Sequence, residues 1–203
     1  MSDEQATRRP RMTAQQRRES ILAAATEVFA ETGYQRGKTS AVAQRVGVSE
    51  PVIFQNFGTK AALFAAVVTR HADQVCAWLD RLTAQRVSVA GLLAAALDPT
   101  HVEHIHDAGT IGALFAEAST LTGEPEIEAA AHRANQRIAG ALTNLLEQGR
   151  RAGELRADLD TESGAWWLLS LAASQKFRRA AAPETIEARL AKTTLEFFIG
   201  NEH

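Results

Sequence analysis

Gln55 and Lys60 carry the side chains whose chemistry is clearest in this chain of 203 residues. A glutamine amide can form two hydrogen bonds with an adenine edge in the major groove, and apolar side chains such as Pro51 and Val52 can lie against a thymine methyl. A lysine beside a helix start can hold a phosphate together with the helix amides. These residue types at this spacing are typical of a surface that contacts double-stranded DNA.

Two short helices, expected at residues 39–46 and 50–57, must position these side chains. Thr39 or Ser40 can cap the first helix, because a hydroxyl can accept a hydrogen bond from an unpaired helix amide. Gly47 can adopt the left-handed conformation that ends a helix. The pattern predicts the short, glycine-containing connection of a helix-turn-helix.

The second helix has an inward and an outward face. Ser49 is expected to cap it, and a turn of about 100° per residue places Ile53 and Phe57 inward. Pro51 and Gln55 then point outward, where they are available to a partner.

The apolar residues on the outer face leave two interpretations open. Pro51, Val52 and Phe54 gain nothing from contact with water, so they lie against either DNA or a neighbouring helix. Lys60 opposes the positive end of its helix dipole, so its ammonium either meets a phosphate or bends into water. Its position directly after the turn motif favours the phosphate.

The N-terminal third of the chain resembles the TetR family of transcriptional regulators. The matching residues are Ile21, Leu22, Ala23, Ala24, Ala25, Val28, Phe29, Gly33, Tyr34, Thr39, Ala43, Gly47, Val48, Ser49, Ile53, Phe54, Phe57, Lys60 and Leu63. The resemblance implies an all-α fold, with a three-helix DNA-binding domain containing the helix-turn-helix and a larger C-terminal helical ligand-binding and dimerisation domain.

The resemblance also implies roles for individual residues. Contacts to the DNA backbone are implied for Thr39, Ser40, Phe54, Asn56 and Lys60, and contacts to bases for Glu50, Pro51, Val52 and Gln55. Two positions depart from the family pattern. Phe54 stands where a tyrosine is usual and lacks its hydroxyl, and Asn56 stands where histidine or tyrosine is common.

Charge is distributed unevenly along the chain. Residues 1–60 carry nine Lys/Arg against six Asp/Glu, and residues 61–203 carry thirteen against eighteen. A basic N-terminal part suits the approach to a polyanion. We expect a basic arm at residues 1–12, a DNA-binding domain at 13–60 and a helical regulatory and dimerisation domain at 61–203.

The expected arm contains Arg8, Arg9 and Arg11 around Pro10. It is interpreted either as a solvated tail or as a minor-groove or phosphate contact.

Beyond Lys60 the apolar residues recur at helical spacing, and no strand pattern is present. Helices are expected at residues 14–32, 39–46, 50–57, 60–82, 88–98, 101–121, 125–152, 161–180 and 183–199. Asp160 is a plausible cap for the eighth of these. The helix that begins at Lys60 is expected to join the two domains.

The last two expected helices predict a subunit interface, because residues 164–177 are apolar almost all round and need covering on two sides. Residues assigned to this interface are Trp167, Leu171, Ser174, Phe177, Ile186, Leu190 and Phe197. The resemblance implies a homodimer formed as a four-helix bundle. Two-fold symmetry would set the heads about 34 Å apart over a near-palindromic operator. A monomeric buried helix pair is the alternative.

The middle of the chain is expected to hold any effector, because it is rich in alanine and glycine and poor in bulky side chains. Candidate ligand-binding residues are Trp78, His104, Ile111, Leu114, Phe115, Trp166 and Trp167. The same residues also suit an ordinary hydrophobic core.

Three histidines, His101, His104 and His106, could include metal ligands, with Glu103 among them. No single helical face offers three of these ligands, so we predict no metal site and no cofactor. A metal-dependent helical-bundle enzyme using residues 101–106 is the alternative function that this cluster leaves open.

The expected function is a dimeric repressor that binds DNA and is released by a small, largely apolar ligand. Other interpretations are a TetR-like activator, a regulator without an effector, and a helical protein whose head binds protein instead of DNA. Because the chain shows neither a signal-peptide pattern nor a run of about 18 apolar residues, we expect a cytoplasmic protein without a membrane span. Cys76, the single cysteine, is expected to be buried, with a redox-sensing thiol as the alternative.

Overall fold

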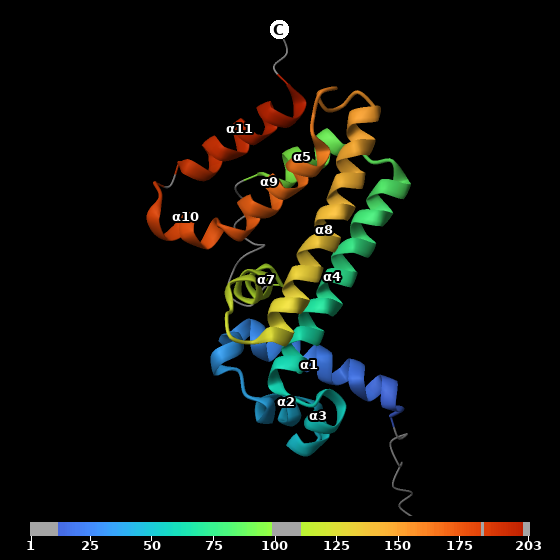
Figure 1. Cartoon of the computed structure of the whole chain (residues 1–203), viewed down its shortest axis with the longest axis vertical. Coiled ribbons are helices and arrows are strands. Elements are labelled where there is room, and N and C mark those ends of the chain that lie inside the picture. Colours follow the sequence, from blue (N-terminus) through green and yellow to red (C-terminus); the bar gives the residue numbers. More distant parts are fainter. Residues whose placement is uncertain (1–11, 99–110, 184, 201–203) are drawn as a thin grey trace, which may run out of the picture.

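The computed structural model describes residues 12–98, 111–183 and 185–200, and the regular structure in these ranges is helical (Figure 1). The helices are α1 (Ala14–Arg36), α2 (Thr39–Val46), α3 (Glu50–Phe57), α4 (Lys60–Gln85), α5 (Val89–Ala96), α7 (Ile111–Thr120), α8 (Pro125–Arg151), α9 (Thr161–Ala173), α10 (Gln175–Ala181) and α11 (Ile186–Ile199). The expected all-α fold is confirmed. We call residues 13–60 the head and the helices after α4 the body.

The turn between α2 and α3 has the geometry expected of a helix-turn-helix. Gly47 takes the left-handed conformation with φ 74° and ψ 35°. The amide of Val48 donates to the carbonyl of Ala43 at 3.0 Å, which closes the end of α2. Both helices begin and end at the residues that the sequence predicted.

The expected cap of α2 is wrong, and the expected cap of α3 is correct in position but not in its hydrogen bond. Lys38 occupies the N-cap of α2, so Thr39 is already inside the helix. Its hydroxyl donates to the carboxylate of Glu50, across the turn, and is therefore turned away from the α2 amides. Ser49 does occupy the N-cap of α3, but its side chain makes no capping hydrogen bond.

The first helix is longer than expected, because α1 resumes beyond Gly33 and reaches Arg36. Gly33 itself is not helical, with φ 75° and ψ 169°, so the chain is kinked there. A positive φ is inexpensive only for glycine, which explains why the kink falls at this position. The kink turns the backbone amide of Tyr34 toward the body, where it meets Glu117.

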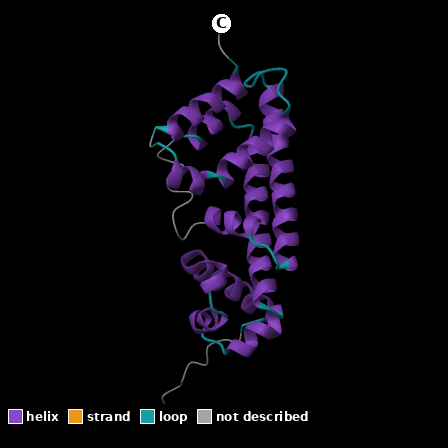
Figure 2. Ribbon diagram, turned by 60° about the vertical axis from the view of Figure 1, so that its left-hand side comes forward, coloured by secondary structure: helices purple, strands orange, loops and turns teal. Residues whose placement is uncertain are grey.

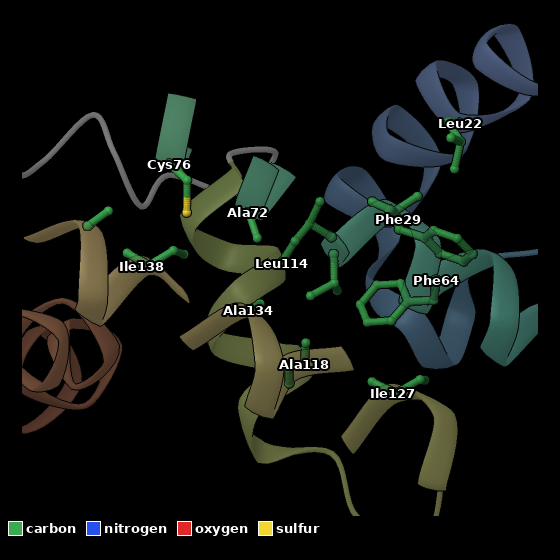
Figure 3. Close-up of a cluster of buried hydrophobic side chains, with 14 of the residues drawn as sticks. Leu22, Phe29, Phe64, Ala72, Cys76, Leu114, Ala118, Ile127, Ala134 and Ile138 are labelled. Atoms are coloured by element: carbon green, nitrogen blue, oxygen red, sulfur yellow. The ribbon is translucent and has the colours of Figure 1, made fainter. Parts of the chain in front are cut away.

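Two long helices, α4 and α8, lie side by side and form the spine of the molecule, with the head at one end (Figure 1). The view turned by 60° shows the same pair (Figure 2). Buried apolar side chains continue from Ile21 in α1 to Phe198 in α11. Phe29 and Phe64 meet edge to face at 5.1 Å between α1 and α4, beside side chains of α7 and α8 (Figure 3).

Cys76 lies in this packing and is buried, as expected. Burial raises the pKa of its thiol above the ordinary value. A raised pKa lowers the fraction of reactive thiolate, which favours the interpretation of Cys76 as a small apolar core residue.

The prediction of a single helix at residues 161–180 is wrong, because the chain bends at Ser174 and forms α9 and α10 instead. The Ser174 hydroxyl donates to the carbonyl of Ser170 at 2.7 Å, and the Arg178 guanidinium donates to the carbonyl of Leu171 at 2.8 Å. Side chains that bond helix carbonyls in this way promote bending. Asp160 caps α9 as predicted, accepting from the amide of Ser163 at 3.1 Å.

Three expectations concern residues outside the described ranges. They are the arm with Arg8, Arg9 and Arg11, the histidine cluster at residues 101–106, and the first part of the helix expected at 101–121.

Within the described part of the chain, no helix on its own has the length and apolar character needed to span a membrane. Only α3 and α4 taken together, bent by 65°, satisfy that criterion.

Candidate nucleic-acid interface and effector cavity

The outer face of α3 is arranged as the sequence predicted. Ile53 and Phe57 are buried in the head, whereas Pro51 and Gln55 are exposed and Val52 is half-buried. Phe54 is also exposed, at 42% of its surface. A short helix thus presents a glutamine amide flanked by apolar side chains, which matches the hydrogen-bonding and methyl groups of the major groove.

Two of the predicted DNA contacts, Thr39 and Glu50, bond each other. Thr39 is only 8% exposed, and its hydroxyl donates to the Glu50 carboxylate. This bond holds the start of α2 against the start of α3. Ser40, the next residue, is exposed in the first turn of α2, where a phosphate could approach its hydroxyl.

Asn56 is half-buried and bonds its own helix. Its side-chain amide donates to the carbonyl of Val52 at 2.7 Å. The backbone carbonyl of Asn56 accepts from the guanidinium of Arg18 in α1 at 2.6 Å, and the same guanidinium lies 4.1 Å from the centre of the Phe57 ring. Arg18 therefore fixes the end of α3 on α1, a role that was not predicted from the sequence.

The side chain of Lys60 folds back toward α1. Its ammonium donates to the carbonyl of Gln35 at 3.1 Å and lies 4.6 Å from the centre of the Tyr34 ring. Burial lowers the pKa of this ammonium, while the neighbouring Glu124 and Glu117 act in the opposite direction. The Lys60 side chain in this structure is thus neither extended into water nor directed along the face of α3.

Three glutamates of the body, Glu117, Glu124 and Glu126, contact the head where α1 ends and α4 begins. Glu117 accepts from the backbone amide of Tyr34 at 2.8 Å, and Glu124 accepts from the Tyr34 hydroxyl at 2.9 Å. Glu126 accepts from the hydroxyl of Thr59 at 3.1 Å. We call these residues the three-glutamate contact.

The three-glutamate contact perturbs Tyr34. Burial, together with the hydrogen bond and charge of Glu124, raises the pKa of Tyr34 to about 12. Thr59 takes part in two bonds, because its oxygen also accepts from the amide of Ala62 at 2.9 Å as the cap of α4. The first turn of α4 is therefore bonded to the body as well as to the head.

The three-glutamate contact was not predicted from the sequence. The gap between the helices expected at residues 101–121 and 125–152 indicated a connection there, but nothing in the spacing of the glutamates pointed to Tyr34, which lies 90 positions before Glu124.

An apolar cavity of about 270 Å³ lies between the spine and the C-terminal helices. Its lining residues are Trp78, Leu79, Leu82, Val89, Leu92, Leu93, Ala96, Leu97, Leu142, Leu145, Leu146, Leu168, Leu171, Ala172, Gln175, Arg178, Glu187, Leu190 and Ala191. Its size and its mainly apolar wall are close to those of small-molecule sites.

Of the residues predicted to bind ligand, Trp78 lines this cavity. Leu114 is instead buried in the core and Phe115 packs against it. Trp166 borders a separate, more polar groove with Gly140, and Trp167 stacks on Phe197.

The remaining two of those residues cannot be placed in the cavity. His104 and the side chain of Ile111 lie outside the described part. The leucines of α5 that form much of the wall, Leu92 and Leu93, were not singled out from sequence.

The predicted interface residues fall into three groups. Trp167, Phe177 and Phe197 are large and exposed, with Phe177 at 72%. Leu171 and Leu190 line the cavity instead. Ser174 is exposed at the bend after α9, and Ile186 is half-buried at the start of α11. The exposed aromatic residues leave an apolar surface along α9 to α11 that a second subunit could cover.

The head has a helix-turn-helix with an exposed outer face on α3, and one long helix joins it to a helical body with a cavity. This combination defines the class of helix-turn-helix DNA-binding transcriptional regulators. Residues 21–67 match the sequence profile described as bacterial regulatory proteins, tetR family. This match and the helical fold support a transcriptional regulator of the TetR family.

Two characterised relatives are transcriptional regulators. The chain is 28% identical over 166 residues to the HTH-type transcriptional activator FasR of Mycolicibacterium smegmatis, covering 78% of this chain and 75% of the relative. It is 25% identical over 146 residues to the HTH-type transcriptional repressor Rv1474c of Mycobacterium tuberculosis, covering 72% and 73%. These similarities lend no support to the enzyme alternative.

The fold is also similar to that of the transcriptional regulator FadR from Bacillus subtilis, solved in complex with stearoyl-CoA. The TM-score is 0.65 at 17% identity, over 91% of this chain and 99% of that one.

Proposed function

We propose that this TetR-family regulator is a homodimer whose affinity for a near-palindromic operator falls when a small, largely apolar ligand occupies the cavity. It represses transcription where that operator overlaps a promoter. The observation that carries the proposal is the course of α4, which begins in the head at Lys60 and lines the cavity with Trp78, Leu79 and Leu82.

DNA recognition in this proposal divides between two sets of side chains. Gln55, Pro51 and Val52 on α3 meet base edges, and Ser40 and Lys60 meet phosphates. Thr39 and Glu50 bond each other in the free protein, so their part is to fix the angle between α2 and α3 unless DNA separates them.

Lys60 must leave the carbonyl of Gln35 to reach a phosphate, because its ammonium is now held against Tyr34. Glu124 and Glu117 of the three-glutamate contact also attract the Lys60 ammonium in this position. A ligand that moves the cavity-lining part of α4, near Trp78, relative to α8 changes these contacts and so changes the position of the head. A ligand can shift affinity in this way only if it prefers one arrangement over the other.

The family relationship and the exposed aromatic surface support the dimer. Trp167, Phe177 and Phe197 are spread over α9, α10 and α11, and their exposure is difficult to reconcile with a monomer in water. The FadR structure was solved with stearoyl-CoA, whose long acyl chain is apolar, and this supports an apolar ligand part for the present cavity.

Fluorescence anisotropy with labelled fragments from upstream of the gene tests the DNA-binding half of the proposal. One fragment should bind more tightly than random duplex of equal length at moderate salt, with two protein chains per site. If every fragment binds no better than random duplex, the operator proposal is wrong.

The effector half is tested by adding decanamide to the complex formed with the preferred fragment. The ligand should release the DNA from the wild-type protein. Leu92→Trp, which places an indole in the cavity, should retain DNA binding and lose the response. Equal release from both proteins would show that the cavity does not mediate the effect.

A further inference from the structure

The wall of the cavity is apolar except at one place. Gln175, Arg178 and Glu187 are its polar members, and they come from α10 and α11. The rest of the wall consists of leucine, alanine, valine and tryptophan. A ligand that fills the cavity therefore meets hydrogen-bonding groups at one end of an otherwise apolar space.

The charged groups at that end already compensate each other. The Arg178 Nε donates to Glu187 at 2.8 Å and its Nη2 donates to the other oxygen of the same carboxylate at 3.1 Å. The pair is largely enclosed, with side-chain exposures of 12% and 23%. Such a bidentate pair combines charge with fixed geometry.

Arg178 is engaged on its third nitrogen as well. Nη1 donates to the carbonyl of Leu171 at 2.8 Å and to the hydroxyl of Ser174 at 2.7 Å. The guanidinium is thus anchored by the bend between α9 and α10, and it cannot turn toward a ligand without losing these bonds. Gln175 is next to this bend and is only 1% exposed, with its neutral amide in the cavity wall.

From this arrangement we infer that the cavity selects an apolar molecule bearing one uncharged hydrogen-bonding group, such as an amide, ester or alcohol, and discriminates against acids and amines. This inference rests on the proposed effector role of the cavity. A ligand carboxylate would lose its water and find Arg178 already bonded to Glu187. A ligand ammonium would find Glu187 already bonded to Arg178. Burial of an uncompensated charge is unfavourable, whereas a neutral polar group needs only hydrogen bonds.

Isothermal titration calorimetry of the full-length protein with decanamide, decanoate and decylamine tests the inference. The three probes share a chain length and differ in the charge of the end group at about pH 8. The affinity for decanamide should exceed that for either charged probe by a factor of about ten or more.

Substitution of Glu187 separates this selectivity from the general preference of an apolar space for neutral molecules. Glu187→Gln leaves the positive charge of Arg178 without its carboxylate, so the ratio of decanoate to decanamide affinity should rise about tenfold. Because the ratio compares two probes on one protein, a general loss of stability does not imitate the effect. Glu196→Gln, at an exposed residue of the same helix paired with Lys192, should leave the ratio unchanged.

Two results overturn the inference while leaving the effector cavity in place. One is a wild-type protein that binds decanoate or decylamine more tightly than decanamide, with that binding lost in Leu92→Trp. The other is an unchanged ratio in Glu187→Gln. If none of the probes binds a wild-type protein that still binds its operator, the effector role of the cavity is wrong and the inference is wrong with it.

Discussion

The ammonium of Lys60 has two alternative negatively charged environments. One is formed by Glu117 and Glu124 within the protein, and the other is the proposed DNA phosphate. In the free protein its ammonium is held by the carbonyl of Gln35 and the ring of Tyr34, close to Glu117 and Glu124. These groups attract the positive charge of Lys60, as a DNA phosphate would. The position of the side chain in the free protein is therefore compatible with the proposed phosphate contact, but a rearrangement must precede it.

Lys60→Ala should weaken binding to the operator and make the dependence of log operator affinity on log salt concentration shallower by about one unit per head. Titrations at several salt concentrations measure the slope. Lys192→Ala, which removes an exposed cation on α11, should leave the slope unchanged. An unaltered slope for Lys60→Ala would show that this ammonium does not meet DNA.

Gln55→Ala should relax the preference at one base-pair position, because Gln55 is exposed on α3 and is assigned a base edge. The expected loss is about 1 to 3 kcal/mol of discrimination at that position. Competition with operator variants measures it, with Gln85→Ala at the far end of α4 as the control. An equal loss on operator and random DNA would contradict the assignment.

The hydroxyl of Tyr34 should make the stability of the protein depend on pH at alkaline values. The pKa of Tyr34 is raised from 10.0 to about 12 in the folded chain, so its stabilising contribution is complete below pH 10 and is lost as the pH rises toward 12. Tyr34→Phe should lower the free energy of unfolding by about 1 kcal/mol at neutral pH. The difference between the two proteins should shrink across that alkaline window.

Urea denaturation at a series of pH values compares Tyr34→Phe with the wild-type protein. Parallel pH profiles for the two proteins would show that the Tyr34 to Glu124 bond has no energetic role.

At the scale of elements, Gly47 and Gly140 form a natural pair for substitution. A Cβ at either position would meet no atom within 4 Å, so backbone conformation alone decides the outcome. Gly47→Ala should destabilise by about 1 kcal/mol, because φ is 74° there. Gly140→Ala, inside α8, should stabilise by about 0.5 to 1 kcal/mol. Thermal unfolding that shows the same sign for both would contradict this account.

Much of the element order could be predicted from the sequence. The bounds of α2 and α3 follow from local signals, namely Gly47 after the first helix and Pro51 early in the second, and they were correct. The bend at Ser174 was missed, because it depends on Arg178 reaching back to the carbonyl of Leu171, and the apolar pattern of that segment is continuous.

The candidate site was predictable only where it depends on a single helix. The outward direction of Gln55 follows from helix periodicity. The fold-back of Lys60 onto Gln35 depends on how α1 approaches α4. The cavity walls depend on how α5, α8 and the C-terminal helices pack, which residue spacing along the chain does not reveal.

At the scale of the whole molecule, the exposed aromatic residues of the C-terminal helices make the dimer testable. Phe177→Ala and Phe197→Ala together should shift the protein from dimer toward monomer in sedimentation velocity, since each removes an exposed apolar surface expected at the interface. Operator affinity should fall with dimer content, because the two heads no longer bind as one unit.

Phe54→Ala provides the matched control, because it removes another exposed phenylalanine in the head. This variant should remain dimeric and lose DNA affinity. A double variant at Phe177 and Phe197 that sediments as the wild-type protein does would place the interface elsewhere.

The retracted position of Lys60 also affects how the protein finds its operator. A dimer with both lysines held against Tyr34 meets random duplex DNA with two fewer available cations, so fewer counterions are released and non-specific association is weaker. Non-specific sites outnumber operators by many orders of magnitude, and time spent on them delays the search. We expect the protein to leave random sequence quickly and to extend both lysines only where α3 finds matching bases.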